Sequence, residues 1–172
     1  MKHLLKSLFL KVETTYKTNA NPTPADVILA ENVEIDPLQM QTDDYTPVST
    51  KFGMGEKIVG AVWCSVQFDV AVGGGGTPVG AAGGVPNHDA VLRAGAMARV
   101  IVPGVNITYS PIDSAEESVS AVYHIDTARF AVLGLRGDLE WIFEAQKAPR
   151  MRFTGLGPVS YTHLRAHETE AT

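Results

Sequence analysis

The run from Ile58 to Val72 constrains the fold more than any other part of the chain. Its apolar residues recur at every second position, while Ser65, Gln67 and Asp69 lie between them. Alternation with a period of two is typical of an antiparallel strand with one buried face and one face in water. The apolar positions are Val62, Cys64, Val66, Phe68, Val70 and Val72. Other elements of the chain must therefore cover this face.

Two later segments, Ser118–Asp126 and Asp138–Ala145, show the same alternation. In the second of them we expect Leu139, Trp141 and Phe143 to face the core. Between the two, Gly134–Gly137 is predicted to form a turn or a bulge. Shorter strands are predicted at Leu8–Val12, Val27–Leu29, Val33–Ile35, Val100–Val102, Ile107–Tyr109, Arg129–Leu135 and Arg150–Leu156.

One stretch, Pro86–Gly95, favours a helix. Asn87 is suited to the N-cap, and Asp89 and Arg93 have the spacing of an ion pair on a helix. Gly95 is suited to a left-handed position just after the helix. A helix this short is marginal in water, so we expect the side that carries Val91 and Leu92 to dock on the sheet.

These elements predict a mainly β (α+β) fold: an antiparallel β-sandwich or barrel with one short flanking α-helix. A chain of 172 residues has the size of one domain, and its 16 glycines and 10 prolines suit many turns. The net charge of -5 argues against a general nucleic-acid binder. The single cysteine, Cys64, excludes an internal disulfide and a cysteine-built zinc site.

The two ends of the chain differ in composition from the segments between them. The first eleven residues begin basic and turn apolar, but Lys6 and Lys11 interrupt them, so we expect a first strand or an N-terminal arm of a cytosolically made protein and no signal peptide. No apolar run is long enough to span a bilayer. Residues 159–169 resemble one translated reading frame of a transposon-type sequencing adapter. We therefore expect residues 1–157 to be a single domain, truncated near Gly157, and residues 158–172 to be a non-native tail.

The segment Gln39–Lys57 has neither a helical nor a strand period. Structureless connections of this length in a compact domain are usually functional or disordered. We expect this one to be a long loop that reaches a partner molecule. It carries Asp43, Asp44, Tyr45, Phe52 and Met54.

The sequence shows no group of residues with the pattern of a catalytic site. No catalytic residue, metal ligand or cofactor is therefore predicted. The run Gly73–Gly76 lacks the Lys-Ser or Lys-Thr of a phosphate-binding loop. Cys64 lies on the apolar face of its strand and is expected to be a buried, inert thiol. His88 and His124 are expected at the surface. The pairs Asp43-Asp44 and Glu116-Glu117 are expected to be solvated acids.

The two tryptophans allow a binding hypothesis. Trp141 is expected in the core, whereas Trp63 lies opposite the apolar face of its strand and could anchor an interface. Together with Tyr45 and the acidic pairs, Trp63 also leaves open a carbohydrate-binding β-sandwich module.

Several separated segments, in order, resemble the tail tube (major tail) proteins of long-tailed bacteriophages. The matching segments are Glu13–Tyr16, Asn21–Thr23, Val62–Val72, Val91–Ala94, Ile107–Pro111, Glu117–Val119, Leu135–Gly137 and Phe153–Leu156. The chain departs from the family pattern in a longer glycine-rich stretch before the helix, and in Gly95-Ala96 where the family has Cys-Gly.

The resemblance implies a structural virion protein and no enzyme: hexameric rings stack into a hollow tube through which DNA passes without specific binding. It would be made in the bacterial cytoplasm, reside in the tail, and contact itself and other tail proteins. We expect the subunit or ring interface to involve Asp43, Asp44, Tyr45, Phe52, Met54 and Trp63. A tail terminator or another injection-tube protein of the same fold is the alternative within this class.

Overall fold

The computed structural model describes residues 6–45, 56–75, 84–125, 128–158 and 161–164. Its strands are β1 (Lys6–Val12), β2 (Val27–Ile28), β3 (Ala30–Tyr45), β4 (Glu56–Ala71), β5 (Met97–Val102), β6 (Asn106–Pro111), β7 (Val119–Ile125), β8 (Ala128–Ile142), β9 (Arg150–Gly157) and β10 (Tyr161–Leu164). One α-helix, α1 (Asp89–Ala94), and a short 3-10 turn, η1 (Pro24–Asp26), complete the described elements. This confirms a mainly β, antiparallel fold with one flanking helix.

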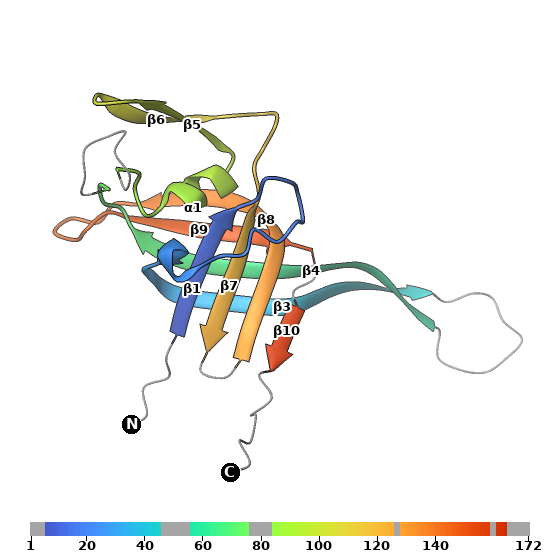
Figure 1. Ribbon diagram of the computed structural model, residues 1–172. Helices are drawn as coiled ribbons and strands as arrows, with labels where there is room; N and C mark the ends of the chain where they lie inside the picture. The colour runs from blue at the N-terminus through green and yellow to red at the C-terminus, as the bar shows by residue number, and fades with distance from the viewer. Residues whose placement is uncertain (1–5, 46–55, 76–83, 126–127, 159–160, 165–172) are drawn as a thin grey trace, which may run out of the picture.

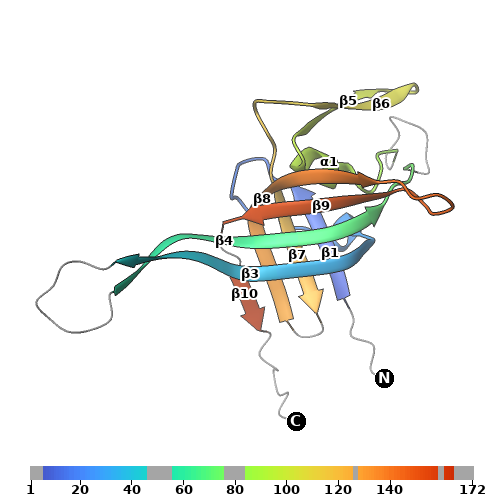
Figure 2. The same cartoon turned by 180° about the vertical axis from the view of Figure 1, so that it is seen from behind.

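The strands form two layers that share β8. The pairing order is β2-β1-β7-β8-β9-β4-β3, with β10 also on β8 and with β5 and β6 as a separate hairpin. The first half of β8 pairs with β7, and its second half, Arg136–Ile142, pairs with β9. Figures 1 and 2 show β1, β7 and the first half of β8 crossing the layer of β9, β4 and β3. Such crossed layers are typically joined at a strand that bends from one to the other.

The bend in β8 is a bulge, as the sequence predicted for Gly134–Gly137. The register between β7 and β8 shifts after the pair Val119–Leu135, and Gly134 has a φ of 68°. This left-handed conformation favours glycine. The strands predicted at Arg129–Leu135 and Asp138–Ala145 are therefore one continuous strand.

The core lies between the two layers. Val66 and Phe68 of β4, Leu135 of β8, and Met151 and Phe153 of β9 are almost fully buried. The Phe68 and Phe153 rings pack with their centroids 5.3 Å apart. The alternation predicted for β4 is confirmed from Cys64 to Val70, and Cys64 is buried as expected. In β7, by contrast, both faces are buried, since Ser120 and Val122 are covered as well as Val119 and Ala121.

Helix α1 confirms the expected docking, because Val91 and Leu92 are buried. Its ends differ from the prediction. His88 and not Asn87 is the N-cap, and His88 is buried, with its pKa lowered by the loss of solvation. Gly95 has a φ of -90°, and the left-handed residue is Ala96. Gly95 is needed for another reason: a β-carbon there would overlap the Leu139 side chain.

The prediction of a long loop at Gln39–Lys57 is wrong in the described part of that segment. β3 continues through Asp36-Pro37 to Tyr45 and pairs with β4, which begins at Glu56. Three register shifts interrupt this pairing, at Glu31/Glu34, Asp36/Gln39 and Met40/Thr42. The first two shifts each put an extra residue into β3 and move its alternation out of phase, which hides the strand in the sequence. The second of them accommodates Pro37.

The expectation that Trp141 and Phe143 lie in the core is also wrong. Their side chains are 42% and 74% exposed. Leu139 packs against the core, as the alternation predicts. The layer of β1 and β7, however, does not extend over the last part of β8. His124 is partly exposed and meets the Phe9 ring edge-on at 5.5 Å.

Candidate assembly surfaces

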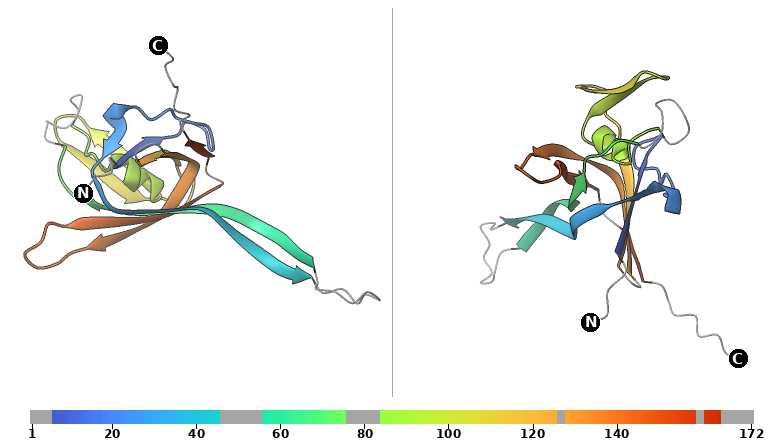
Figure 3. Two further views of the ribbon diagram at one scale, coloured as in Figure 1. Left: turned by 90° about the horizontal axis from the view of Figure 1, so that it is seen from below. Right: turned by 90° about the vertical axis from the view of Figure 1, so that its left-hand side faces the viewer.

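The hairpin of β3 and β4 projects well beyond the rest of the molecule (Figures 1 and 3). We call its outer part, residues 38–45 and 57–61, the arm. β9 pairs with β4 only from Cys64 to Ala71, so none of the described strands lies beside the arm. Five large apolar side chains of the arm are about half exposed: Leu38, Met40, Tyr45, Ile58 and Val59. A monomer gains nothing by displaying such a group of side chains in water.

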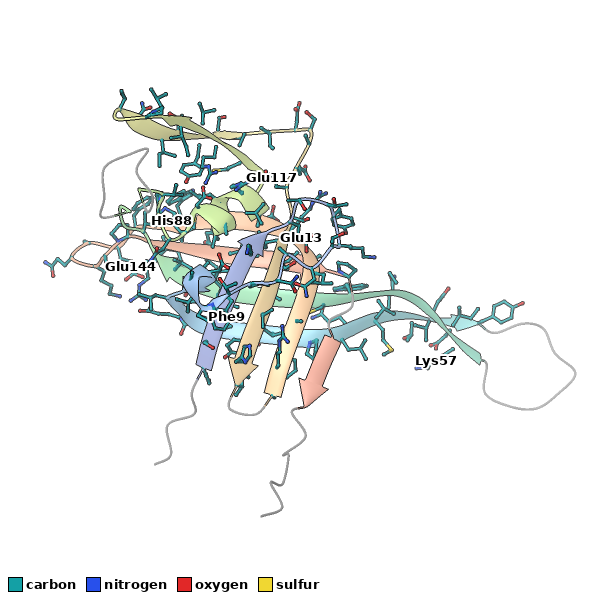
Figure 4. The ribbon with its side chains drawn as sticks, viewed as in Figure 1. Phe9, Glu13, Lys57, His88, Glu117 and Glu144 are labelled. Atoms are coloured by element: carbon teal, nitrogen blue, oxygen red, sulfur yellow. The ribbon has the colours of Figure 1, made fainter. Side chains whose placement is uncertain are left out.

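The structure places part of the predicted interface on the arm. Asp43, Asp44 and Tyr45 lie at its far end, where Asp44 is 3.7 Å from the exposed ammonium of Lys57 (Figure 4). Trp63 lies at its base, six residue pairs back along the hairpin, which is about 20 Å. Phe52 and Met54 lie outside the described residues.

Trp63 is held by a hydrogen-bond network. Its indole N–H donates to Gln39 Oε1 at 2.6 Å, and Gln39 Nε2 donates to Asp36 at 3.0 Å and to Ser65 at 3.2 Å. The side chain is only partly exposed. The network fixes the indole against the base of the arm, so Trp63 contributes first to the rigidity of the hairpin.

The layer formed by β3, β4, β9 and the second half of β8 has unpaired outer edges. Among the described strands, nothing pairs with the far edge of β3 or with the far edge of Arg136–Ile142. Free strand edges are templates for pairing with another chain. The same layer therefore offers one edge at each side to a neighbouring molecule.

The solvent-facing side of this layer carries more acids than bases, and we call it the acidic face. The pairing register puts six acids and two arginines there, Glu31, Glu34, Asp36, Asp69, Asp138 and Glu140 with Arg150 and Arg152. Asp69 is buried beneath its partners, and Arg152 Nε donates to it at 2.8 Å. That hydrogen bond lowers the pKa of the Asp69 carboxyl.

A hollow of about 550 Å³ lies where the end of β1 meets the residues before β7. Its charged side chains are paired with one another: Arg93 donates to Glu117, and Arg136 lies 3.7 Å from Glu116. Figure 4 shows Glu13 and Glu117 on this side of the molecule. The expectation that Glu116-Glu117 is merely solvated is therefore wrong for Glu117, which is held by Arg93, whereas Glu116 is exposed.

Glu13 holds strands together at the centre of the fold, a role that the sequence did not predict. Its buried carboxylate accepts hydrogen bonds from Ser118 Oγ at 2.6 Å, Ser120 Oγ at 2.7 Å, Gly134 N at 2.8 Å and Lys17 N at 3.0 Å. The only signal in the sequence was serine alternating with apolar residues at Ser118–Ala121.

A stacked aromatic pair was missed as well. The Trp141 and Phe143 rings are nearly parallel, with an angle of 3° between their planes and 6.3 Å between their centroids. They lie at the end of β8 that points away from the arm, near Glu144 in Figure 4.

Within the described ranges, no group of three or more histidine, cysteine or acidic residues is placed to hold a metal ion. No described helix has the length and hydropathy needed to cross a membrane.

Comparison with known proteins gives a fold but no sequence family. No family model and no curated protein matches the sequence. A chain of the sheath-tube complex of PVC, an extracellular contractile injection system in its extended state, superposes with a TM-score of 0.53 at 10% identity, covering 91% of this chain and 88% of that one. The PVC sheath/tube terminator gives 0.53 at 11% identity, covering 91% and 92%.

The tube-terminating cap of the anti-feeding prophage gives a TM-score of 0.51 at 9% identity, covering 91% of this chain and 87% of that one. At such low identities the likeness concerns the fold alone. The fold of this chain is therefore one found among structural components of phage-tail-like injection systems, in agreement with the tail-protein resemblance of the sequence.

Proposed function

We propose that this protein is a tube subunit of a phage tail or a phage-tail-like particle. Copies join side by side by pairing the β3 edge of one with the β8 edge of the next, and the resulting rings stack through the arm. The observation that carries the proposal is the arm itself, a projecting hairpin whose apolar side chains are not covered by any described residue. Six copies per ring follow from the family resemblance.

The layering favours one orientation of the subunit in such a ring. The crossing strands, α1 and the β5–β6 hairpin all lie on one side of the layer that would be continued (Figure 3). These added elements occupy more space than the layer itself, so they fit on the outside of the ring, where the circumference is larger. The acidic face then lines the lumen. An excess of carboxylates repels phosphates, and DNA would pass without binding.

A terminator of the same fold is the second candidate, favoured by the likeness to a tube-terminating cap and to a sheath/tube terminator. A terminator closes one end and should form single rings, whereas a tube subunit should form open-ended tubes. The carbohydrate-binding alternative has one supporting observation, the exposed parallel rings of Trp141 and Phe143.

The test is negative-stain electron microscopy of the purified full chain together with analytical ultracentrifugation. Tubes support the first proposal and single rings support the terminator. A monomer at every concentration, which then binds glycans on an array, would replace both by the carbohydrate-binding function.

A pair of matched variants tests the arm. Val59→Lys places a charge on the arm, and Leu156→Lys places one on the acidic face, at positions that are each 55% exposed. We expect Val59→Lys to raise the concentration for half-maximal tube formation about tenfold or more, as for the loss of a well-packed interface residue. Leu156→Lys should assemble like the wild type. Equal behaviour of the two variants would refute docking through the arm.

A further inference from the structure

The β5–β6 hairpin stands off the body, beyond α1 and on the β8 side of the molecule (Figures 1 and 2). Val100 and Val102 share one face of it and are 56% and 43% exposed, and Val105 at its tip is 70% exposed. No charged residue occurs from Val100 to Ile112. A hairpin of this composition loses little hydration when it is covered by apolar groups.

The base of the hairpin is firmly attached. Asp89 of α1 accepts a hydrogen bond from Arg99 Nη1 at 2.8 Å and another from the Tyr109 hydroxyl at 2.6 Å. The backbone N–H of Ile112 donates to the carbonyl of Ala96 at 3.0 Å. A two-stranded hairpin is marginally stable alone in water, and no element among the described residues covers the exposed valines of this one.

A groove with both apolar and polar side chains in its lining lies on the opposite side of the molecule, between β1, β2 and the start of β3. It has a volume of about 430 Å³, and its lining includes Leu8, Ile28, Val33 and Tyr123. At its rim Leu29 is 80% exposed and Val27 is 43% exposed. We call it the corner groove. The strands that line it, β1, β2 and the start of β3, lie like the hairpin on the side of the molecule away from the arm (Figures 1 and 2).

The size of the edge contact shows that more surface is needed. Pairing through the seven residues Arg136–Ile142 gives a contact about 23 Å long, and a sheet is about 10 Å thick. That buries on the order of 230 Å² per partner, whereas a stable interface buries about 800 Å². The flanking elements must contribute the rest, and these are the hairpin beside the β8 edge and the corner groove beside the β3 edge.

We infer that the β5–β6 hairpin of one copy occupies the corner groove of the next copy in the ring. The inference rests on the proposed edge-to-edge ring. It is a heterologous contact, in which two different patches of the same chain meet, and its repetition gives a ring when the rotation between neighbours closes. Val100, Val102 and Val105 provide the apolar face of the hairpin, and Val27 and Leu29 provide that of the groove.

Engineered disulfides test the contact in the full chain. Val102→Cys is combined in turn with Val27→Cys, Leu29→Cys and Asn32→Cys, and the assemblies are oxidised in air with copper phenanthroline. Three groove positions are used because a disulfide requires a Cα separation of about 4.4–6.8 Å. At least one pair should give a ladder of covalent oligomers on non-reducing gels. The native Cys64 is buried and should not take part.

The control combines Val102→Cys with Leu156→Cys, which lies on the acidic face and should give no ladder. Wild-type rings in the microscope without a ladder from any of the three pairs would overturn the hairpin contact and leave the proposed function standing. A wild-type chain that never leaves the monomeric state would overturn both.

Discussion

Glu13 is the residue on which the junction of β1, β7 and β8 depends most. Its carboxylate is the acceptor for two serine hydroxyls and for the backbone N–H of the bulge residue Gly134. Glu13→Ala leaves these buried donors without an acceptor, and we expect it to lower the free energy of unfolding by about 3 kcal/mol. Urea unfolding measures the change. Glu116→Ala is the control, since that acid is largely exposed, and a similar loss there would contradict this role of Glu13.

The ion pair of Asp69 with Arg152 predicts how the free energy of unfolding changes in acid. The hydrogen bond from Arg152 lowers the pKa of the Asp69 carboxyl below the ordinary 3.8. A carboxyl with a lowered pKa in the folded state contributes stability above its unfolded pKa, and the contribution disappears as the pH falls through the folded value. The unfolding free energy of the wild type should therefore fall more steeply below about pH 4 than that of Asp69→Asn. Parallel curves for the two proteins would show that this ion pair does not stabilise the fold.

At the scale of elements, the bend of β8 depends on glycines that face each other across the β8–β9 pair. Gly137 lies opposite Gly155, and a β-carbon at Gly137 would collide with the carbonyl of Thr154 and with Gly155. We expect Gly137→Ala to cost about 2 kcal/mol or more, since the backbone must move. Gly73→Ala, where a β-carbon meets nothing within 4 Å, should change stability by less than about 1 kcal/mol. Thermal unfolding distinguishes the two, and equal melting temperatures would refute the close approach.

At the scale of the whole molecule, the acidic face predicts how assembled particles treat DNA. Wild-type tubes should not retain duplex DNA in a co-sedimentation assay at low salt. Reversing three acids, with Glu34→Lys, Asp36→Lys and Asp138→Lys, should make the lumen retain DNA, and rising salt should release it. The control reverses Asp113 and Glu116, which lie on the other side of the layer. Equal DNA binding by both sets would mean that this face does not line a lumen.

Some elements of the molecule could be predicted from the sequence and others could not. The strand at β4 and the docking of α1 could be predicted, because local periodicity alone decides which of their side chains avoid water. The arm could not, since two register shifts and Pro37 erase the alternation of β3. The two predicted interface residues Phe52 and Met54 lie outside the described part of the chain, and Trp63 proved to be tied to Gln39.

The class of the fold and the resemblance to tail proteins follow from the order of the residues alone, because alternation, glycine content and motif order are local properties of a chain. The exposure of Trp141 and Phe143 and the burial of Glu13 and His88 follow from the packing of the layers. Burial depends on where a distant layer ends, and no local pattern records that. The free edges of β3 and β8 likewise appear only once the two layers have been placed across each other.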